Sequence, residues 1–105
     1  MSSRLADPAE PAASAAHRGL SQNVSCFSIR AEADPGVMPR VLQLFAKRNL
    51  VPHRWHSDRH GPGGRDLAID LQVEGLAPEV ADYIARCLRQ LHYVDAVLTS
   101  EKARP

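Results

Sequence analysis

The sequence of 105 residues has little of three things that many functions need: cysteine, aromatic side chains and net charge. Two cysteines, Cys26 and Cys87, are too few for a disulfide-stabilised scaffold and suit a reducing cytoplasm. A formal net charge of +1 provides no bulk attraction to nucleic acid or to an anionic membrane. No apolar run approaches the length of a transmembrane helix, and none has the form of a secretory signal. We therefore expect a cytoplasmic protein with no nucleic-acid or membrane partner.

The first part of the chain differs in composition from the rest. Residues 1–22 are rich in Ala, Pro and Ser, and after Met1 their only large apolar side chains are Leu5 and Leu20. Such a segment cannot bury enough apolar surface to offset the entropy that it loses on ordering. The sequence therefore predicts a flexible tail over 1–22 and one folded domain over 23–102, a size that is often stabilised by oligomerisation.

Hydrophobic periodicity predicts six elements in the folded part. Alternation of apolar and polar residues indicates strands with one buried face, and apolar residues at helical spacing indicate amphipathic helices. The strands are expected over residues 24–32, 51–60, 66–74 and 92–100, and the helices over residues 37–48 and 78–91. The second strand contains a proline and many charges, which are typical of the edge of a sheet.

The order of these elements, β-α-β-β-α-β, defines the expected fold. Each strand has one apolar face and each helix one apolar stripe, so the economical packing places both helices on one side of a four-stranded antiparallel sheet. This is an α+β, ferredoxin-like βαββαβ sandwich. In the last strand, Val94, Ala96 and Leu98 are expected to point inward. Trp55 is expected either in the core or at a dimer interface.

The stretch ADPGVMPRV, residues 33–41, places two prolines at the start of the first helix. Proline is tolerated in the first helical turn, so Pro39 requires the helix to begin at Gly36 or Val37. The N–H groups of Val37 and Met38 would then be free at the positive end of the helix dipole, where an anion such as a carboxylate could bind. An ordinary strand-to-helix turn explains the same residues.

A strand followed by DPGVMPRVLQLFAKRNL, an extended segment and LAIDLQVEG resembles an ACT domain, and more narrowly the short regulatory subunit of acetolactate synthase. The resemblance implies a homodimer, a branched-chain amino acid as effector, a large catalytic subunit as partner and no cofactor. It places the ligand contacts at Gly36, Val37 and Met38. The family usually has Asp or Asn where this chain has Ala33, so we add the neighbouring Asp34 as a candidate ligand contact.

Two other functions remain as alternatives. Ala33 favours a subunit that stabilises a partner enzyme without sensing a ligand. A cluster of His53, His56 and His60 beside Asp58 suits either a metal ion or a solvated edge that prevents aggregation.

The outward positions of the first and third strands carry no aromatic residue, which argues against an RNA-binding sheet. No catalytic set is recognisable in the sequence, so we expect a protein that is not an enzyme.

Overall fold

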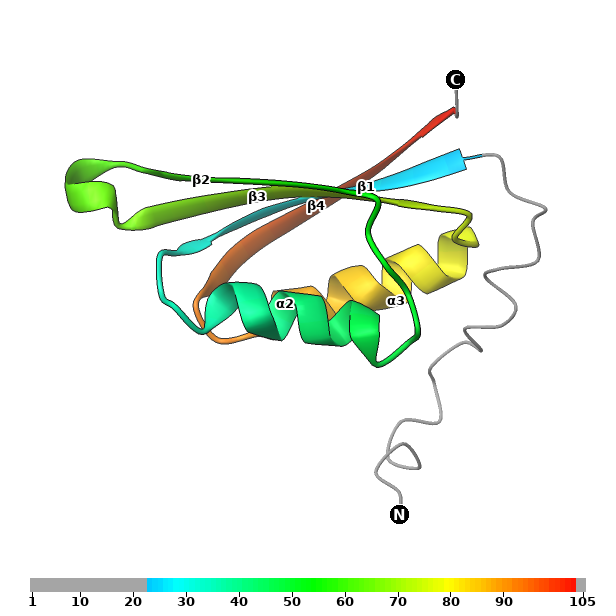
Figure 1. Ribbon diagram of the computed structural model, residues 1–105, viewed down its shortest axis with the longest axis horizontal. Coiled ribbons are helices and arrows are strands. Elements are labelled where there is room, and N and C mark those ends of the chain that lie inside the picture. The colour runs from blue at the N-terminus through cyan, green and yellow to red at the C-terminus, as the bar shows by residue number, and fades with distance from the viewer. Residues whose placement is uncertain (1–22, 104–105) are drawn as a thin grey trace, which may run out of the picture.

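The computed structural model describes residues 23–103, in which two helices cover one side of a sheet (Figure 1). In chain order the elements are β1 (Asn23–Glu32), α2 (Val37–Ala46), β2 (Arg54–His60), the 3-10 turn η2 (Pro62–Gly64), β3 (Asp66–Glu74), α3 (Pro78–Arg89) and β4 (Val94–Ala103). The strands are antiparallel and lie in the order β2-β3-β1-β4. The predicted ferredoxin-like sandwich is confirmed, whereas the predicted tail lies outside the described residues.

Local sequence explains where the helices begin and end. Helix α2 follows Gly36 directly, so Pro39 is the third helical residue and costs no helical hydrogen bond. The turn after α2 contains Asn49 at a φ of 61°, the left-handed conformation that asparagine tolerates. Helix α3 starts at Pro78, whose fixed φ suits the first helical position. None of the described helices is long and apolar enough to span a membrane.

The core lies between the sheet and the two helices. Phe27 on β1 packs edge-to-face against Phe45 on α2, with ring centroids 5.6 Å apart. The central strands β1 and β3 alternate as predicted, because every second residue faces the helices and is buried. Trp55 on β2 is partly buried and packs against this core, in agreement with the first of its two expected roles.

Strand β4 departs from the predicted alternation. Val94 lies opposite Ala31, but Ala96 lies opposite Arg30, so the register shifts and Asp95 is an extra residue. Such a bulge reverses which side chains face the core beyond it. Val97 is therefore buried, whereas Ala96 is exposed and Leu98 is 71% exposed. The prediction that Ala96 and Leu98 point inward is wrong.

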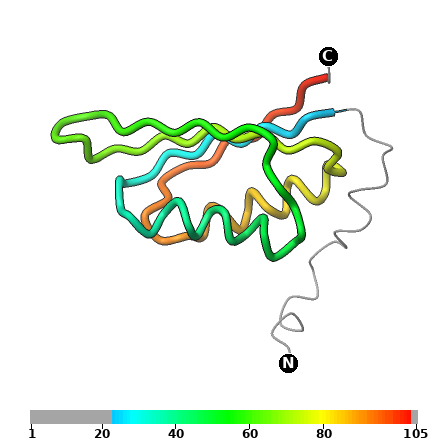
Figure 2. Tube along the Cα trace, viewed as in Figure 1, coloured from blue at the N-terminus to red at the C-terminus, as the bar shows by residue number. Residues whose placement is uncertain are grey.

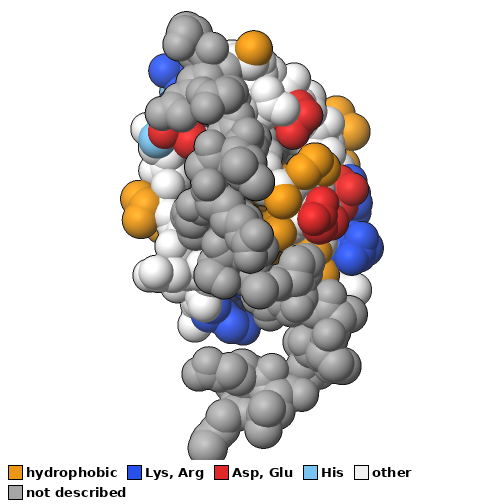
Figure 3. All heavy atoms as spheres, turned by 90° about the vertical axis from the view of Figure 1, so that its right-hand side faces the viewer, with side chains coloured by type: hydrophobic (Ala, Val, Ile, Leu, Met, Phe, Trp, Pro, Cys, Tyr) orange, Lys and Arg blue, Asp and Glu red, His pale blue; other side chains and the backbone are white. Residues whose placement is uncertain are grey.

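The hairpin of β2 and β3 extends past the first turn of α2, as the trace in Figure 2 shows. Strand β2 begins at Arg54, later than predicted, and Val51 is 82% exposed in the segment before it. Glycines at positive φ, including Gly64 at 66°, form the hairpin turn. On the side seen in Figure 3, both acidic and basic side chains are visible at the surface.

Candidate functional site

A pocket of about 220 Å³ lies where β1 passes into α2, beneath the extended β2–β3 hairpin. The loop after β1 is held against the hairpin because the Ala33 N–H donates to the Arg65 carbonyl at 2.8 Å. The pocket is lined by Ala33, Asp34, Pro35, Met38, Arg59 and Leu67. Two of the four predicted ligand contacts, Asp34 and Met38, thus share one pocket with residues from the hairpin.

Asp34 closes the turn that precedes α2. Its carboxylate oxygen Oδ2 accepts a hydrogen bond from the Gly36 N–H at 2.9 Å, and its carbonyl accepts one from the Val37 N–H at 3.1 Å. The expectation of a free Val37 N–H is therefore wrong, because the turn satisfies that donor internally. No backbone partner for the Met38 N–H is found among residues 23–103, so this donor remains beside the pocket.

Gly36 acts through its small size. Its φ of −81° is accessible to any residue, so conformation does not require glycine here. A Cβ at this position would collide with the guanidinium of Arg40 and lie 3.2 Å from Asp34 Oδ2. The absence of a side chain at Gly36 thus leaves room for the Arg40 guanidinium and, less critically, for the Asp34 carboxylate at the rim of the pocket.

Two opposite charges, Asp34 and Arg59, line the same pocket. The Nε of Arg59 donates to the Gly64 carbonyl at 2.9 Å, and Asp34 binds the Gly36 N–H. Within the described range, neither side chain takes part in an ion pair. The pocket therefore presents an anion and a cation that are both available to a small polar ligand.

Sequence reasoning missed Arg59, although a signal was present. Arg59 lies opposite Leu67, which is a core position of β3, and two positions along β2 from Ser57. It therefore belongs to the face of β2 that carries Trp55 and looks toward the helices. Strand alternation could thus have given the face of Arg59, but its exposed side chain and its contact with the hairpin turn could not be predicted from sequence.

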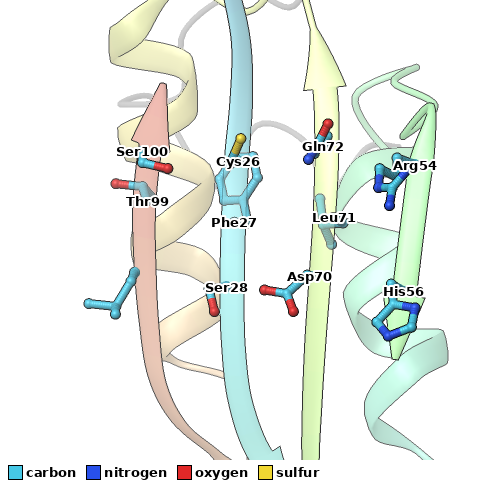
Figure 4. A pocket seen from close by; sticks show the side chains of 11 residues that line it. Cys26, Phe27, Ser28, Arg54, His56, Asp70, Leu71, Gln72, Thr99 and Ser100 are labelled. Atoms are coloured by element: carbon cyan, nitrogen blue, oxygen red, sulfur yellow. The ribbon is translucent and has the colours of Figure 1, made fainter. Parts of the chain in front are cut away.

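A second hollow, of about 660 Å³, lies on the open face of the sheet (Figure 4). Its side chains follow the strand register in two rows, one of Arg54, Gln72 and Cys26 and one of His56, Asp70 and Ser28. Phe27 and Leu71 form only its floor, because their side chains are buried on the opposite face. The hollow thus has no aromatic surface of Phe, Tyr or Trp on which a base could stack.

The histidine cluster is spread along the exposed edge strand β2 and the residue before it, His53. His56 Nε2 lies 3.0 Å from Asp58 Oδ2, and both side chains are more than half exposed. In the part of the chain that the structure describes, no three His, Cys, Asp or Glu side chains come close enough together to hold a metal ion. The histidines are thus arranged as a solvated edge.

Comparison with known proteins places this fold in a family. Residues 19–104 match the family model described as an ACT-like domain. The chain belongs to the ACT-like domain family. Members of this family are typically ligand-binding regulatory modules, and the pocket at the start of α2 is the feature of this ACT-like domain that suits such a role.

Solved structures agree on the fold of this ACT-like domain. The ACT domain from GTP pyrophosphokinase of Chlorobium tepidum is 12% identical, with a TM-score of 0.62 over 73% of this chain and 96% of that one. The C-terminal domain of the MgtC protein from Mycobacterium tuberculosis is 11% identical, with a TM-score of 0.61 over 82% of this chain and 94% of that one. Identities this low show the fold alone. The search of curated proteins found no match.

Proposed function

We propose that this ACT-like domain binds a small amino acid in the pocket at the start of α2 and thereby regulates a partner enzyme. The observation that carries the proposal is the Asp34 carboxylate, which lines the pocket without an ion-pair partner in the described range. A carboxylate placed in this way suits the ammonium group of an amino acid, because charge-assisted hydrogen bonds are the strong ones.

The rest of the pocket suits a small apolar side chain. Ala33, Met38 and Leu67 give it apolar walls, and Leu67 belongs to the buried core. Its volume of about 220 Å³ is below the range of roughly 300–1,000 Å³ that is usual for drug-sized ligands. A single amino acid fits this size class better than a nucleotide does.

The narrower proposal is a small regulatory subunit of an acetolactate-synthase-like enzyme. It is supported by the resemblance of residues 24–98 to such subunits and by the apolar walls of the pocket, which suit valine, leucine or isoleucine. The active form would be a homodimer with Gly36, Val37 and Met38 near the dimer interface, bound to a large catalytic subunit.

Thermal unfolding with and without each of the twenty amino acids, at millimolar concentration, tests the proposal. A ligand at about 100 times its dissociation constant adds roughly 2.7 kcal/mol to the free energy of unfolding. For a domain of this size, each kcal/mol raises the melting temperature by about 4–8 °C. We expect an increase of ten degrees or more with one branched-chain amino acid. The D-enantiomer of the same amino acid is the control, and it should give a much smaller shift.

An unchanged melting temperature with all twenty amino acids would contradict amino-acid binding. A shift with a polar amino acid alone would support an amino-acid-binding regulatory module but contradict a branched-chain amino acid as its ligand.

A subunit that supports its partner without a ligand is the second candidate. Ala33 favours it, because the pocket wall is apolar where the family usually has a polar contact. Co-purification with a catalytic subunit, unaffected by any amino acid, would support this candidate over the first.

A further inference from the structure

Arg59 is the cation of the pocket, and the resemblance to ACT domains does not assign it a role. It enters from β2, on the side of the sheet that faces the helices, and lines the pocket together with Asp34. We propose that the guanidinium of Arg59 binds the carboxylate of the amino acid, and that the glycine turn of the hairpin holds it in place. This inference rests on the proposed function and names the charged group that recognises the ligand.

The hairpin turn holds Arg59 by one of its three nitrogen atoms. The Nε donates to the Gly64 carbonyl at 2.9 Å, and within residues 23–103 the two terminal nitrogens have no partner. A guanidinium fixed at Nε still has both terminal amino groups for a carboxylate, which accepts such a pair of parallel hydrogen bonds. The contact thus orients the side chain and leaves its binding capacity intact.

Gly64 is shaped for this contact. It has a φ of 66°, which side-chain-bearing residues rarely adopt, and a Cβ there would lie 2.9 Å from Arg59 Nη2 and 3.4 Å from its Cζ. A side chain at this position would therefore strain the turn and displace the guanidinium. The position of the Arg59 guanidinium therefore depends on glycine at position 64.

The backbone offers a weaker alternative for the carboxylate. The N–H groups of Gly36 and Val37 are already bonded to Asp34, which leaves the single N–H of Met38. One backbone donor competes poorly with a guanidinium, because the guanidinium can form two parallel hydrogen bonds to the carboxylate and also carries the opposite charge. The charge of Asp34 also requires a cation on the other side of the ligand if the pocket is to prefer a zwitterion over a simple amine.

The test compares each of the twenty amino acids with its carboxamide, in which a neutral amide replaces the carboxylate. Binding of both is measured by calorimetry to the full chain, its Arg59→Gln variant and an Arg65→Gln control. Arg65 lies beside the same turn, its Nε is directed to the Pro62 carbonyl at 3.4 Å, and its side chain does not line the pocket. We expect the unmodified chain and the control to prefer the amino acid by at least about tenfold. Arg59→Gln should bind both forms with equal, weaker affinity.

Each other outcome counts against a defined part of the argument. If Arg59→Gln keeps the full preference, another group at the start of α2 recognises the carboxylate, and this inference is overturned while the proposed function stands. If the unmodified chain binds neither form of any amino acid, the proposed function fails and the inference with it. Arg59→Lys, which keeps the charge and loses the planar pair of donors, provides a second variant. It should keep only part of the preference, and a full preference would contradict recognition by the guanidinium pair.

Discussion

The two faces of the sheet carry hollows of very different character. The hollow on the open face is the larger, at about 660 Å³ against about 220 Å³ for the pocket at the start of α2. The polar side chains of the larger hollow point outward from the sheet, as polar side chains do on any sheet face that is exposed to water. On the opposite face, Arg59 pairs with Leu67 of β3, which belongs to the core. Asp34 and Arg59 both line the apolar pocket on this face. The difference between the two hollows is one of charge placement rather than of size, and it is the reason why the smaller pocket is the proposed binding site.

Truncation of one aliphatic side chain on each face gives the largest contrast. Ile69 is fully buried between sheet and helices, whereas Leu98 is 71% exposed on the open face. Ile69→Ala should lower the free energy of unfolding by about 2–5 kcal/mol, because it leaves a cavity in the core. Leu98→Ala should change it by less than about 0.5 kcal/mol. Urea denaturation with unchanged slopes measures both values, and equal effects would mean that Leu98 is covered in solution.

The central strands and the last strand show what periodicity can and cannot predict. Strands β1 and β3 are paired on both sides. The alternation of apolar and polar residues correctly predicted which side chains face the helices, and it predicted the bounds of both strands to within one residue. Strand β4 lies at an edge, where the ladder constrains only one side, and Asp95 inserts there. A bulge has no hydrophobic signature of its own. Sequence alone therefore placed Leu98 on the wrong face.

The pocket was predictable only in part. The prolines and Gly36 located the start of α2, and with it Asp34 and Met38. The hydrogen bonds of Asp34 to the Gly36 and Val37 N–H groups depend on the geometry of one turn, which residue types do not specify. The contribution of Arg59 depends on how far the hairpin reaches past α2. That is a property of the tertiary structure.

Neutralising one carboxylate on each face tests the comparison by ligand affinity. Asp34→Asn should reduce affinity for the amino acid identified by thermal unfolding by about ten- to a hundredfold, because the charge that binds the ammonium group is lost. Asparagine keeps an oxygen that can accept the Gly36 N–H, so the turn should persist. Asp70→Asn, on the open face, should leave affinity unchanged. Calorimetry of both variants measures this, and an equal loss in Asp70→Asn would move the site to the open face.

The smallest effect is expected from the His56–Asp58 pair on the exposed edge, which is an ion pair only while His56 is protonated. His56 and Asp58 lie 3.0 Å apart with 63% and 64% of their side-chain surfaces exposed, so solvent screens them strongly. A double-mutant cycle with His56→Ala and Asp58→Ala should give a coupling free energy of about 0.2–1 kcal/mol, at the low end of that range for so exposed a pair. In 1 M salt, where the Debye length is about 3 Å, the coupling should fall further. A coupling well above this range, or one that salt does not weaken, would show that the pair is shielded from water. The open face would then be covered in the functional assembly, and its hollow would have to be reconsidered as an interface.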